Sequence, residues 1–304
     1  MKIAVLSTAV DSWESRRISR EITKLGHEAT RTSFQGSYVS VGMSYNDNGN
    51  GTVTLQKFMA AQKRIMRQDV LIPRVGRHYY LTLAYMILKQ MEAIGKPATL
   101  SADSLLNCKN KFLCMQQLTL AGVPVPKSFL IGPSVPLDSP LKQLPGPYVL
   151  KLLDRSKGIG AIKLNSRVEA RMHIREAQTL GSNHSTALQE CIPNRGDLRL
   201  FWIGDRVVAA MKRTAKKGEW RSNYSRGGFI EPHEPTSDEE KITARAAKAL
   251  GIEIGGIDVI ENKNNGHLYV LEINSNPGFS GIMKATHINI PRLMVEYAIT
   301  KGKR

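Results

Sequence analysis

Two apolar segments in the C-terminal part of the chain, each interrupted by one acidic residue, constrain its fold and chemistry most strongly. The segments, 256–260 and 268–273, flank turn-forming residues that include Asn-Asn-Gly, which predicts a β-hairpin. Asp258 interrupts the first strand and Glu272 the second, and Asn274 follows on the same strand face as Glu272. Because magnesium and manganese prefer carboxylate and amide oxygens, the pattern predicts a metal site that also holds nucleotide phosphates. The alternative is a set of polar edge-strand residues that face water.

The end of this hairpin follows the pattern acid-x-Asn-x-x-Pro-Gly, from Glu272 to Gly278. The pattern resembles the metal-binding strand of the ATP-grasp carboxylate–amine ligases. A second run, Arg-Ser-Asn-x-x-Arg-Gly-Gly from Arg221 to Gly228, is closely similar to the RimK-type branch of these ligases. The motifs follow the family's order along nearly the whole chain, so the chain is identified by resemblance as a member of this branch.

The resemblance implies an ATP-grasp fold of the α/β (α+β) class. In this fold an N-terminal open parallel-sheet domain precedes two α+β subdomains that enclose ATP. The expected boundaries are 1–100 for the N-terminal domain, 101–192 for the small subdomain with the glycine loop, and 193–304 for the C-terminal subdomain with the metal site.

The N-terminal residues independently predict strands that alternate with helices. An apolar strand at 2–7 precedes a helix, a second strand follows at 70–74, and helical spacing returns at 80–93. This alternation predicts a small, mostly parallel sheet. Further along, the five prolines of 133–147 predict a linker or surface loop, and the basic residues 301–304 predict a frayed tail.

A lysine inside an apolar strand, followed by a glycine-containing loop, predicts a phosphate site. Lys151 interrupts the strand at 148–153, and the next loop contains Lys157, Gly158 and Gly160. A buried ammonium group needs an anionic partner, and the backbone N–H groups of such a loop can bind phosphates. An ordinary hairpin is the alternative interpretation.

A second hairpin, 197–213, contains two arginines in otherwise apolar strands. Arg199 and Arg213 have planar guanidinium groups suited to bidentate recognition of phosphate or carboxylate, and Asp197 is expected to orient one of them. With the family's chemistry, these arginines are the expected catalytic residues, because they would stabilise an acyl-phosphate.

The resemblance assigns the remaining roles. Taken alone, Lys111 is a solvated lysine at a helix start and Glu190 is a surface-strand glutamate. The residues expected to bind nucleotide are Lys111, Lys151, Lys157, Gly158, Gly160, Glu190, Ile192 through its backbone, and Asp197. The residues expected to bind the incoming amino acid are Arg221, Asn223 and Arg226.

Two regions depart from the family pattern. In the glycine loop, Arg155 and Lys157 replace a glycine and a glutamine. After the Pro-Gly turn, Ser280 and Met283 stand where the family has glutamates. These departures predict a difference in loop closure and in the acceptor site.

The resemblance implies an ATP-dependent ligase that forms an amide through an acyl-phosphate. The cofactors would be ATP and Mg²⁺ or Mn²⁺, with two ions expected. The added amino acid would be glutamate by preference. The acceptor would be a protein or peptide C-terminus, such as an acidic peptide or a ribosomal protein, or a small carboxylate. A homotetramer is the oligomer that the resemblance favours.

The formal charge of +17 over 304 residues predicts attraction to polyanions and acidic peptides. Because no nucleic-acid motif accompanies it, nucleic acid is not a favoured partner. A non-catalytic basic protein that binds nucleotide or nucleic acid is the alternative class. No apolar run reaches the roughly 20 residues of a membrane helix, so we expect a cytoplasmic protein. The three cysteines show neither disulfide nor zinc spacing.

Overall fold

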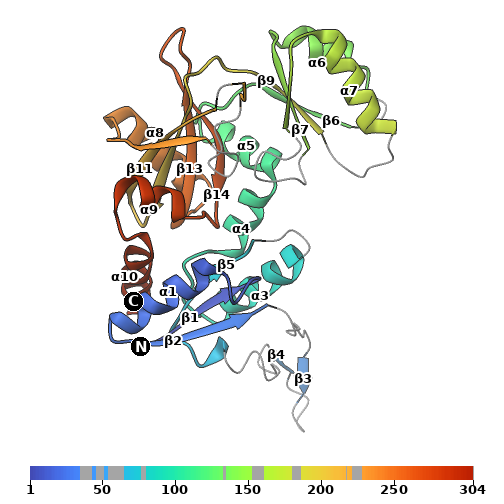
Figure 1. Cartoon of the computed structure of the whole chain (residues 1–304). Coiled ribbons are helices and arrows are strands. Elements are labelled where there is room, and N and C mark those ends of the chain that lie inside the picture. Colours follow the sequence, from blue (N-terminus) through green and yellow to red (C-terminus); the bar gives the residue numbers. More distant parts are fainter. Residues whose placement is uncertain are drawn as a thin grey trace.

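The computed structural model describes residues 1–34, 43–45, 51–53, 65–76, 80–132, 135–152, 161–179, 186–216, 218–220 and 228–303. Within these ranges the chain forms one parallel sheet, two larger antiparallel sheets and a two-stranded hairpin, with helices packed around them (Figure 1). The mixed α/β class predicted from the sequence is confirmed.

The N-terminal sheet is parallel, as its alternating pattern predicts. Its strand order is β2 (Glu28–Ser33), β1 (Lys2–Ser7), β5 (Val70–Arg74). Helix α1 (Trp13–Lys24) starts where the Ser12 side chain accepts a hydrogen bond from the Ser15 N–H. It buries Ile18 and Ile22, and the chain then turns at Gly26, whose φ of 79° favours glycine.

Three further elements belong to the N-terminal part. Helix α3 (Leu81–Ala93) packs beside the sheet, and a short hairpin joins β3 (Met43–Tyr45) to β4 (Gly51–Val53). The predicted turn between these two strands, residues 46–50, lies outside the described residues.

Two helices then lead to the next sheet. They are α4 (Ala102–Lys109) and α5 (Lys111–Leu120), and α5 buries Cys114, Met115 and Leu118. Leu120, in the last turn of α5, is 81% exposed despite its apolar side chain.

The four-stranded region is antiparallel, with the order β6 (Ser128–Ile131), β9 (Thr186–Glu190), β7 (Tyr148–Leu152), β8 (Ala161–Leu164). Helices α6 (Asp138–Gln143) and α7 (Arg167–Thr179) belong to it. The predicted 133–147 loop is therefore wrong in its middle. Pro140 lies in the first turn of α6, where proline is tolerated, and Leu137, Leu141 and Leu144 pack into the core.

The five-stranded sheet is also antiparallel, with the order β12 (Phe229–Pro232), β11 (Arg206–Thr214), β10 (Asp197–Ile203), β13 (Ile254–Glu261), β14 (Leu268–Asn274). Both predicted hairpins are present, as β10–β11 and β13–β14. Helix α8 (Ser237–Ala249) begins with a capping box formed by Thr236 and Glu239.

Two helices complete the chain, α9 (Ser280–Thr286) and α10 (Ile290–Gly302). The predicted frayed tail is wrong for its first residues. Helix α10 continues to Gly302, and Lys301 forms an ion pair with Glu253.

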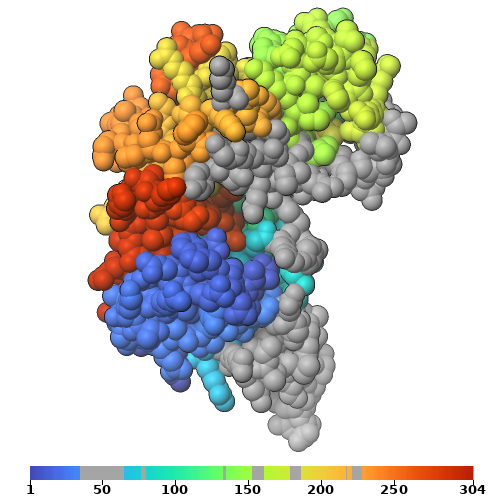
Figure 2. Space-filling view, viewed as in Figure 1, coloured from blue at the N-terminus to red at the C-terminus, as the bar shows by residue number. Residues whose placement is uncertain are grey.

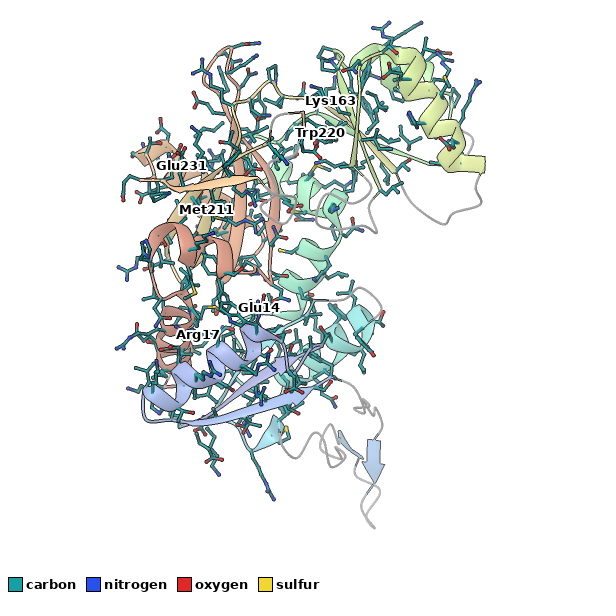
Figure 3. All side chains as sticks on the ribbon, viewed as in Figure 1. Glu14, Arg17, Lys163, Met211, Trp220 and Glu231 are labelled. Carbon is teal, nitrogen blue, oxygen red and sulfur yellow. The ribbon has the colours of Figure 1, made fainter. Side chains whose placement is uncertain are left out.

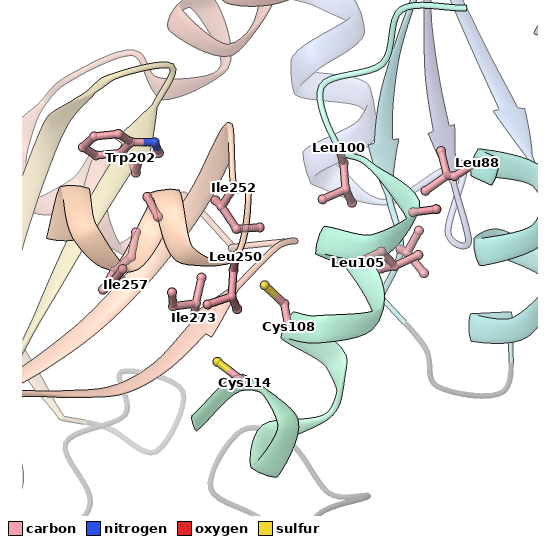
Figure 4. Packing of buried hydrophobic residues seen from close by; sticks show 14 of the residues in the cluster. Leu88, Leu100, Leu105, Cys108, Cys114, Trp202, Leu250, Ile252, Ile257 and Ile273 are labelled. Carbon is pink, nitrogen blue, oxygen red and sulfur yellow. The ribbon is translucent and has the colours of Figure 1, made fainter. Parts of the chain in front are cut away.

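The N-terminal sheet and the five-stranded sheet share their hydrophobic cores, and we call them together the body. One cluster joins Leu6, Leu71 and Leu105 to Leu200 and Ile257, and Figure 4 shows the part of it along α4 and α5. A second cluster unites β1 and β5 with α10 and Phe279. The four-stranded region has its own core, and α6 and α7 project beside the body in Figure 2.

Within the described ranges, every helix is too short or too polar to span a membrane.

Candidate active site

The β13–β14 hairpin brings the three predicted metal ligands onto one face. Asp258 pairs directly with Glu272 across the hairpin, and Asn274 lies two residues further along β14. The Asn274 Nδ2 donates a hydrogen bond to Glu272 Oε1 at 3.0 Å. The alternating pattern that suggested convergence thus produces a compact set of oxygen atoms.

The neighbouring strand β10 adds an arginine directly opposite Asp258. The Arg199 Nε and Nη2 atoms donate to the two carboxylate oxygens of Asp258, each at 2.6 Å. The Arg199 Nη2 also lies 4.0 Å from Glu272 Oε1. This fork connects the two acidic residues of the hairpin.

Arg213, on β11, contacts the same carboxylate oxygen of Asp258 as the Arg199 Nη2. Its Nη2 lies 2.9 Å from Asp258 Oδ2, and its Nε donates to Asp197. The expected orienting contact between Asp197 and Arg213 is therefore present. Asp197 and Arg213 face each other in the β10–β11 register, which explains why residues 16 apart in sequence meet.

This network fixes the charge of Asp258. Burial alone would raise the pKa of its carboxyl group, but Arg199 and Arg213 outweigh burial and hold the pKa well below the ordinary 3.8. Burial likewise lowers the pKa of Arg213, and Asp258 and Asp197 more than reverse that effect. Both groups are charged across the physiological pH range, so the cluster is a permanent array of paired charges.

Two lysines come to the same place from other parts of the chain. The pKa of Lys151, on β7, is lowered to about 8. Burial is the main cause, the charge of Glu272 opposes it, and the charge of Lys111 adds to it. Lys111 begins α5, whose start is fixed by Asn110, since the Asn110 Oδ1 accepts hydrogen bonds from the N–H groups of Phe112 and Leu113. The anionic partner predicted for Lys151 is therefore Glu272, on a different sheet.

Two of the residues expected to bind the nucleotide, Glu190 and Ile192, lie at the end of β9. The Glu190 carboxylate accepts a hydrogen bond from the Lys127 N–H at 2.7 Å and so secures the start of β6. The Ile192 carbonyl accepts from Asn194 Nδ2, while the Ile192 N–H donates to no other residue in the described part of the chain. The backbone of Ile192 thus retains a donor for a ligand.

Six residues of the predicted site lie outside the described ranges. They are Lys157, Gly158, Gly160, Arg221, Asn223 and Arg226. The two strands that flank the glycine loop, β7 and β8, are described, and Lys151 on β7 pairs with Ala161 on β8.

The sequence did not indicate one neighbour of the site, Cys114 on α5. Burial raises the pKa of its thiol to about 12, and a hydrogen bond with the Ile273 backbone opposes this shift. The thiol is therefore inert at neutral pH and acts as an apolar support beneath β14. In the sequence, Cys114 stands out only by its place on the apolar face of a helix, and such a place predicts packing and no chemical role.

The donor atoms fit a hard divalent cation. The Glu272 side chain is 38% exposed, and Asn274 turns its Nδ2 toward Glu272, which leaves its Oδ1 as an acceptor. Within the described ranges, no group of three His, Cys, Asp or Glu side chains gathers in a way that could hold a metal ion without other ligands. Glu272, Asn274 and Asp258, whose two oxygens also accept hydrogen bonds from Arg199, would together offer magnesium two carboxylates and one amide.

Comparison with known proteins places the chain in one family. Residues 108–298 match the model of the RimK-like ATP-grasp domain. The chain is 35% identical over 309 residues to a Legionella pneumophila protein named "Probable alpha-L-glutamate ligase", covering 100% of this chain and 97% of the relative. A Haemophilus influenzae protein with the same name is 37% identical over 233 residues, covering 75% and 76% of the two chains.

Solved structures share the fold at low sequence identity. The ATP-grasp ligase PsnB in complex with its minimal precursor has a TM-score of 0.72 and 19% identity, covering 98% of this chain and 99% of PsnB. The D-alanine–D-alanine ligase of Bacillus anthracis in complex with ATP has a TM-score of 0.71 and 16% identity, covering 100% and 97%.

The fold is that of the ATP-grasp ligases. The chain belongs to the RimK-like ATP-grasp family. It is an enzyme that uses ATP to join a carboxylate to an amine through a carbon–nitrogen bond. The alternative class, a non-catalytic basic binding protein, is not supported.

Proposed function

We propose that this ligase adds an amino acid, with glutamate favoured, to the C-terminal carboxylate of a protein or peptide or to a small carboxylate. The names of the curated relatives support glutamate. The observation on which the proposal depends is the network around Asp258, in which two arginines contact its carboxylate and the Glu272–Asn274 pair lies beside it.

In this proposal, Asp258, Glu272 and Asn274 hold Mg²⁺ or Mn²⁺, two ions in all. The bound metal would supply positive charge to the phosphate oxygens of ATP. Lys111 and Lys151 would neutralise further phosphate oxygens. The lowered pKa of Lys151, about 8, is consistent with an ammonium group that awaits an anionic ligand.

The arginines would act on the substrate. Phosphoryl transfer to the acceptor carboxylate gives an acyl-phosphate, and attack by the amine then expels phosphate as the amide forms. Arg213, and beside it Arg199, would stabilise negative charge on the reacting carboxylate. Their ion pairs with Asp258 and Asp197 fix both guanidinium groups before substrate arrives, so little reorganisation is needed during reaction.

The remaining assignments complete the proposal. The loop residues Lys157, Gly158 and Gly160 would cover the phosphates, and Arg221, Asn223 and Arg226 would bind the incoming amino acid's carboxylate. The Ile192 N–H would bind adenine, with Glu190 and Asp197 supporting the nucleotide's surroundings. We also propose a homotetramer.

Mass spectrometry tests this function directly. The enzyme is incubated with ATP, magnesium, each amino acid in turn, and a panel of peptides and small carboxylates. We expect one class of acceptor to gain the mass of one or more glutamyl residues while ADP accumulates. A panel in which no acceptor gains mass and no ATP is consumed would contradict the proposal.

A further inference from the structure

A buried arginine connects the N-terminal sheet to residues 275–279, which follow β14 and which we call the β14 turn. Arg74 ends β5, and only 6% of it is exposed. Its Nη2 donates to the Pro277 carbonyl at 3.0 Å, and its guanidinium lies 5.6 Å from the centre of the Phe279 ring. That ring centre also lies 5.4 Å from the ring centre of Trp13, at the start of α1. Two N-terminal elements, β5 and α1, thus contact the same turn.

The contact with the β14 turn accounts for an arginine at this buried position. Burial lowers the pKa of Arg74 to about 10, and the charge of Glu14 opposes this shift. Figure 3 shows Glu14 on the part of α1 nearest the five-stranded sheet. A desolvated guanidinium costs free energy that an apolar side chain of similar size would not. What the arginine adds is a donor held against a buried carbonyl.

The β14 turn packs against β13 at a glycine. Gly256 pairs with Asn274 across the hairpin and lies two residues before Asp258, on the same strand face. A Cβ atom at Gly256 would lie 3.1 Å from the Pro277 Cβ and 3.5 Å from both the Cδ and the Nε of Arg199. The φ of Gly256 lies outside the left-handed region, so the position requires glycine for space and not for its backbone angle. The absence of a side chain lets Pro277 and Arg199 approach the same point of β13.

These contacts form a continuous path from the N-terminal sheet to the charged cluster. The path runs from β5 through the β14 turn to Arg199, whose Nε and Nη2 donate to both carboxylate oxygens of Asp258. The turn also follows directly on Asn274, so its position limits where the Asn274 amide can lie. A displacement of the β14 turn would therefore move a candidate metal ligand and an expected catalytic arginine together.

We propose that Arg74 is a positioning residue of this ligase, which acts through the β14 turn on two groups of the site that belong to other strands. These groups are the amide of Asn274 and the guanidinium of Arg199. The inference rests on the proposed function, in which Asn274 holds the metal and Arg199 stabilises charge on the substrate. It adds that the N-terminal sheet fixes the geometry of the metal site from outside. Groups that orient metal ligands in this way change metal affinity or activity by about 10–100-fold when they are removed.

Manganese binding tests the inference without relying on turnover. Mn²⁺ is titrated into the protein in the presence of ADP, and the free ion is measured by electron paramagnetic resonance. Arg74→Met removes the donor to Pro277 and keeps an apolar side chain, and it should weaken Mn²⁺ binding by about 10–100-fold. Arg74→Lys keeps one donor group and should give an intermediate affinity.

A matched control is available in α8. Arg245 also donates through Nη2 to a distant backbone carbonyl, that of Gly122 at 2.6 Å, and so joins α8 to the end of α5 instead of to the β14 turn. Arg245→Met removes the same kind of contact and should keep the wild-type affinity for Mn²⁺. A similar loss of affinity in Arg74→Met and Arg245→Met would contradict the inference.

Gly256→Ala tests the same path from β13. The added methyl group would lie 3.1 Å from the Pro277 Cβ, so the turn must shift, and the Mn²⁺ affinity should fall by the same order as in Arg74→Met. Combined in one protein, the two changes should weaken binding by less than the product of their separate effects, because both act on one turn. Independent effects that multiply would contradict the inference. If Arg74→Met does not fold, Arg74→Lys takes its place in this comparison.

Acceptor kinetics separate positioning from substrate binding. With saturating magnesium-ATP and glutamate and an acceptor that the wild type uses, Arg74→Met should lower kcat and leave the KM for the acceptor unchanged. A raised acceptor KM with wild-type kcat and Mn²⁺ affinity would contradict this inference alone, and so would wild-type Mn²⁺ affinity in Arg74→Met. A wild type that binds no Mn²⁺ with ADP and converts no acceptor would contradict the proposed function as well.

Discussion

The body and the four-stranded region arrange their charges in different ways. In the body, Asp258 and Arg213 are almost completely buried and neutralise each other. In the four-stranded region, the Arg171–Asp138 pair is exposed, and the opposite charge nearest to Lys151 is Glu272 of the body. The comparison teaches that the charges around Asp258 balance within one packed unit, whereas the lysine of β7 needs the body, or a ligand, to balance its charge.

The largest effect should come from breaking the buried pair. Arg213→Met leaves Asp197 and Asp258 buried without their shared cation, and we expect the free energy of unfolding to fall by about 3–5 kcal/mol. Urea denaturation measures the loss. The matched change in the four-stranded region, Arg171→Met, removes a pair whose side chains are 37% and 63% exposed, and should leave the urea midpoint close to that of the wild type. Equal losses in the two variants would refute the contrast.

A smaller effect should show that the core of the four-stranded region is independent of the core of the body. Ile174→Ala in α7 opens a cavity in the core of the four-stranded region and should cost about 3 kcal/mol. Because that core is separate, hydrogen exchange should accelerate in β6–β9 and leave β1, β5, β10 and β13 protected. Leu200→Ala in β10 is the control, and it should accelerate exchange in the N-terminal and five-stranded sheets together. Faster exchange throughout the chain in Ile174→Ala would mean that the cores are not independent.

The pH dependence of stability should show the smallest effect. The pKa of Asp258 is lowered to about 2 in the folded protein, so its stabilising contribution is complete above the unfolded value near 3.8 and disappears as the pH falls toward 2. The difference corresponds to about 2 kcal/mol. Between pH 5 and pH 2 the wild type should lose that much more stability than Asp258→Asn. Parallel curves for the two proteins would show that Asp258 is not held ionised.

The sequence predicted those contacts of the site in which both residues belong to the same hairpin. Asp258, Glu272 and Asn274 follow strand alternation, and Asp197 and Arg213 face each other across a short turn, so local pattern was sufficient. The strand pattern also indicated Lys151 and the family resemblance added Lys111, and the charges of Glu272 and Lys111 both act on Lys151.

Other features depend on contacts that no local pattern records. Arg74 and Pro277 are 203 residues apart, and no local pattern predicts that this strand end and this turn meet. Helix α6 was missed because its prolines suggested a loop, whereas Leu137, Leu141 and Leu144 gain enough burial to order it. Tertiary packing decided both cases.

The most direct test of the account is the role of Glu272 in magnesium-dependent turnover. Its side chain is partly exposed, so Glu272→Gln should fold with the wild-type melting temperature. ADP formation is measured across a magnesium titration with an acceptor that the wild type uses. We expect the wild-type rate to require magnesium, and the variant to be slower by about 10²–10³-fold, as for the loss of one preorganised electrostatic group. A variant that keeps the wild-type rate and magnesium dependence would contradict the assignment of the site.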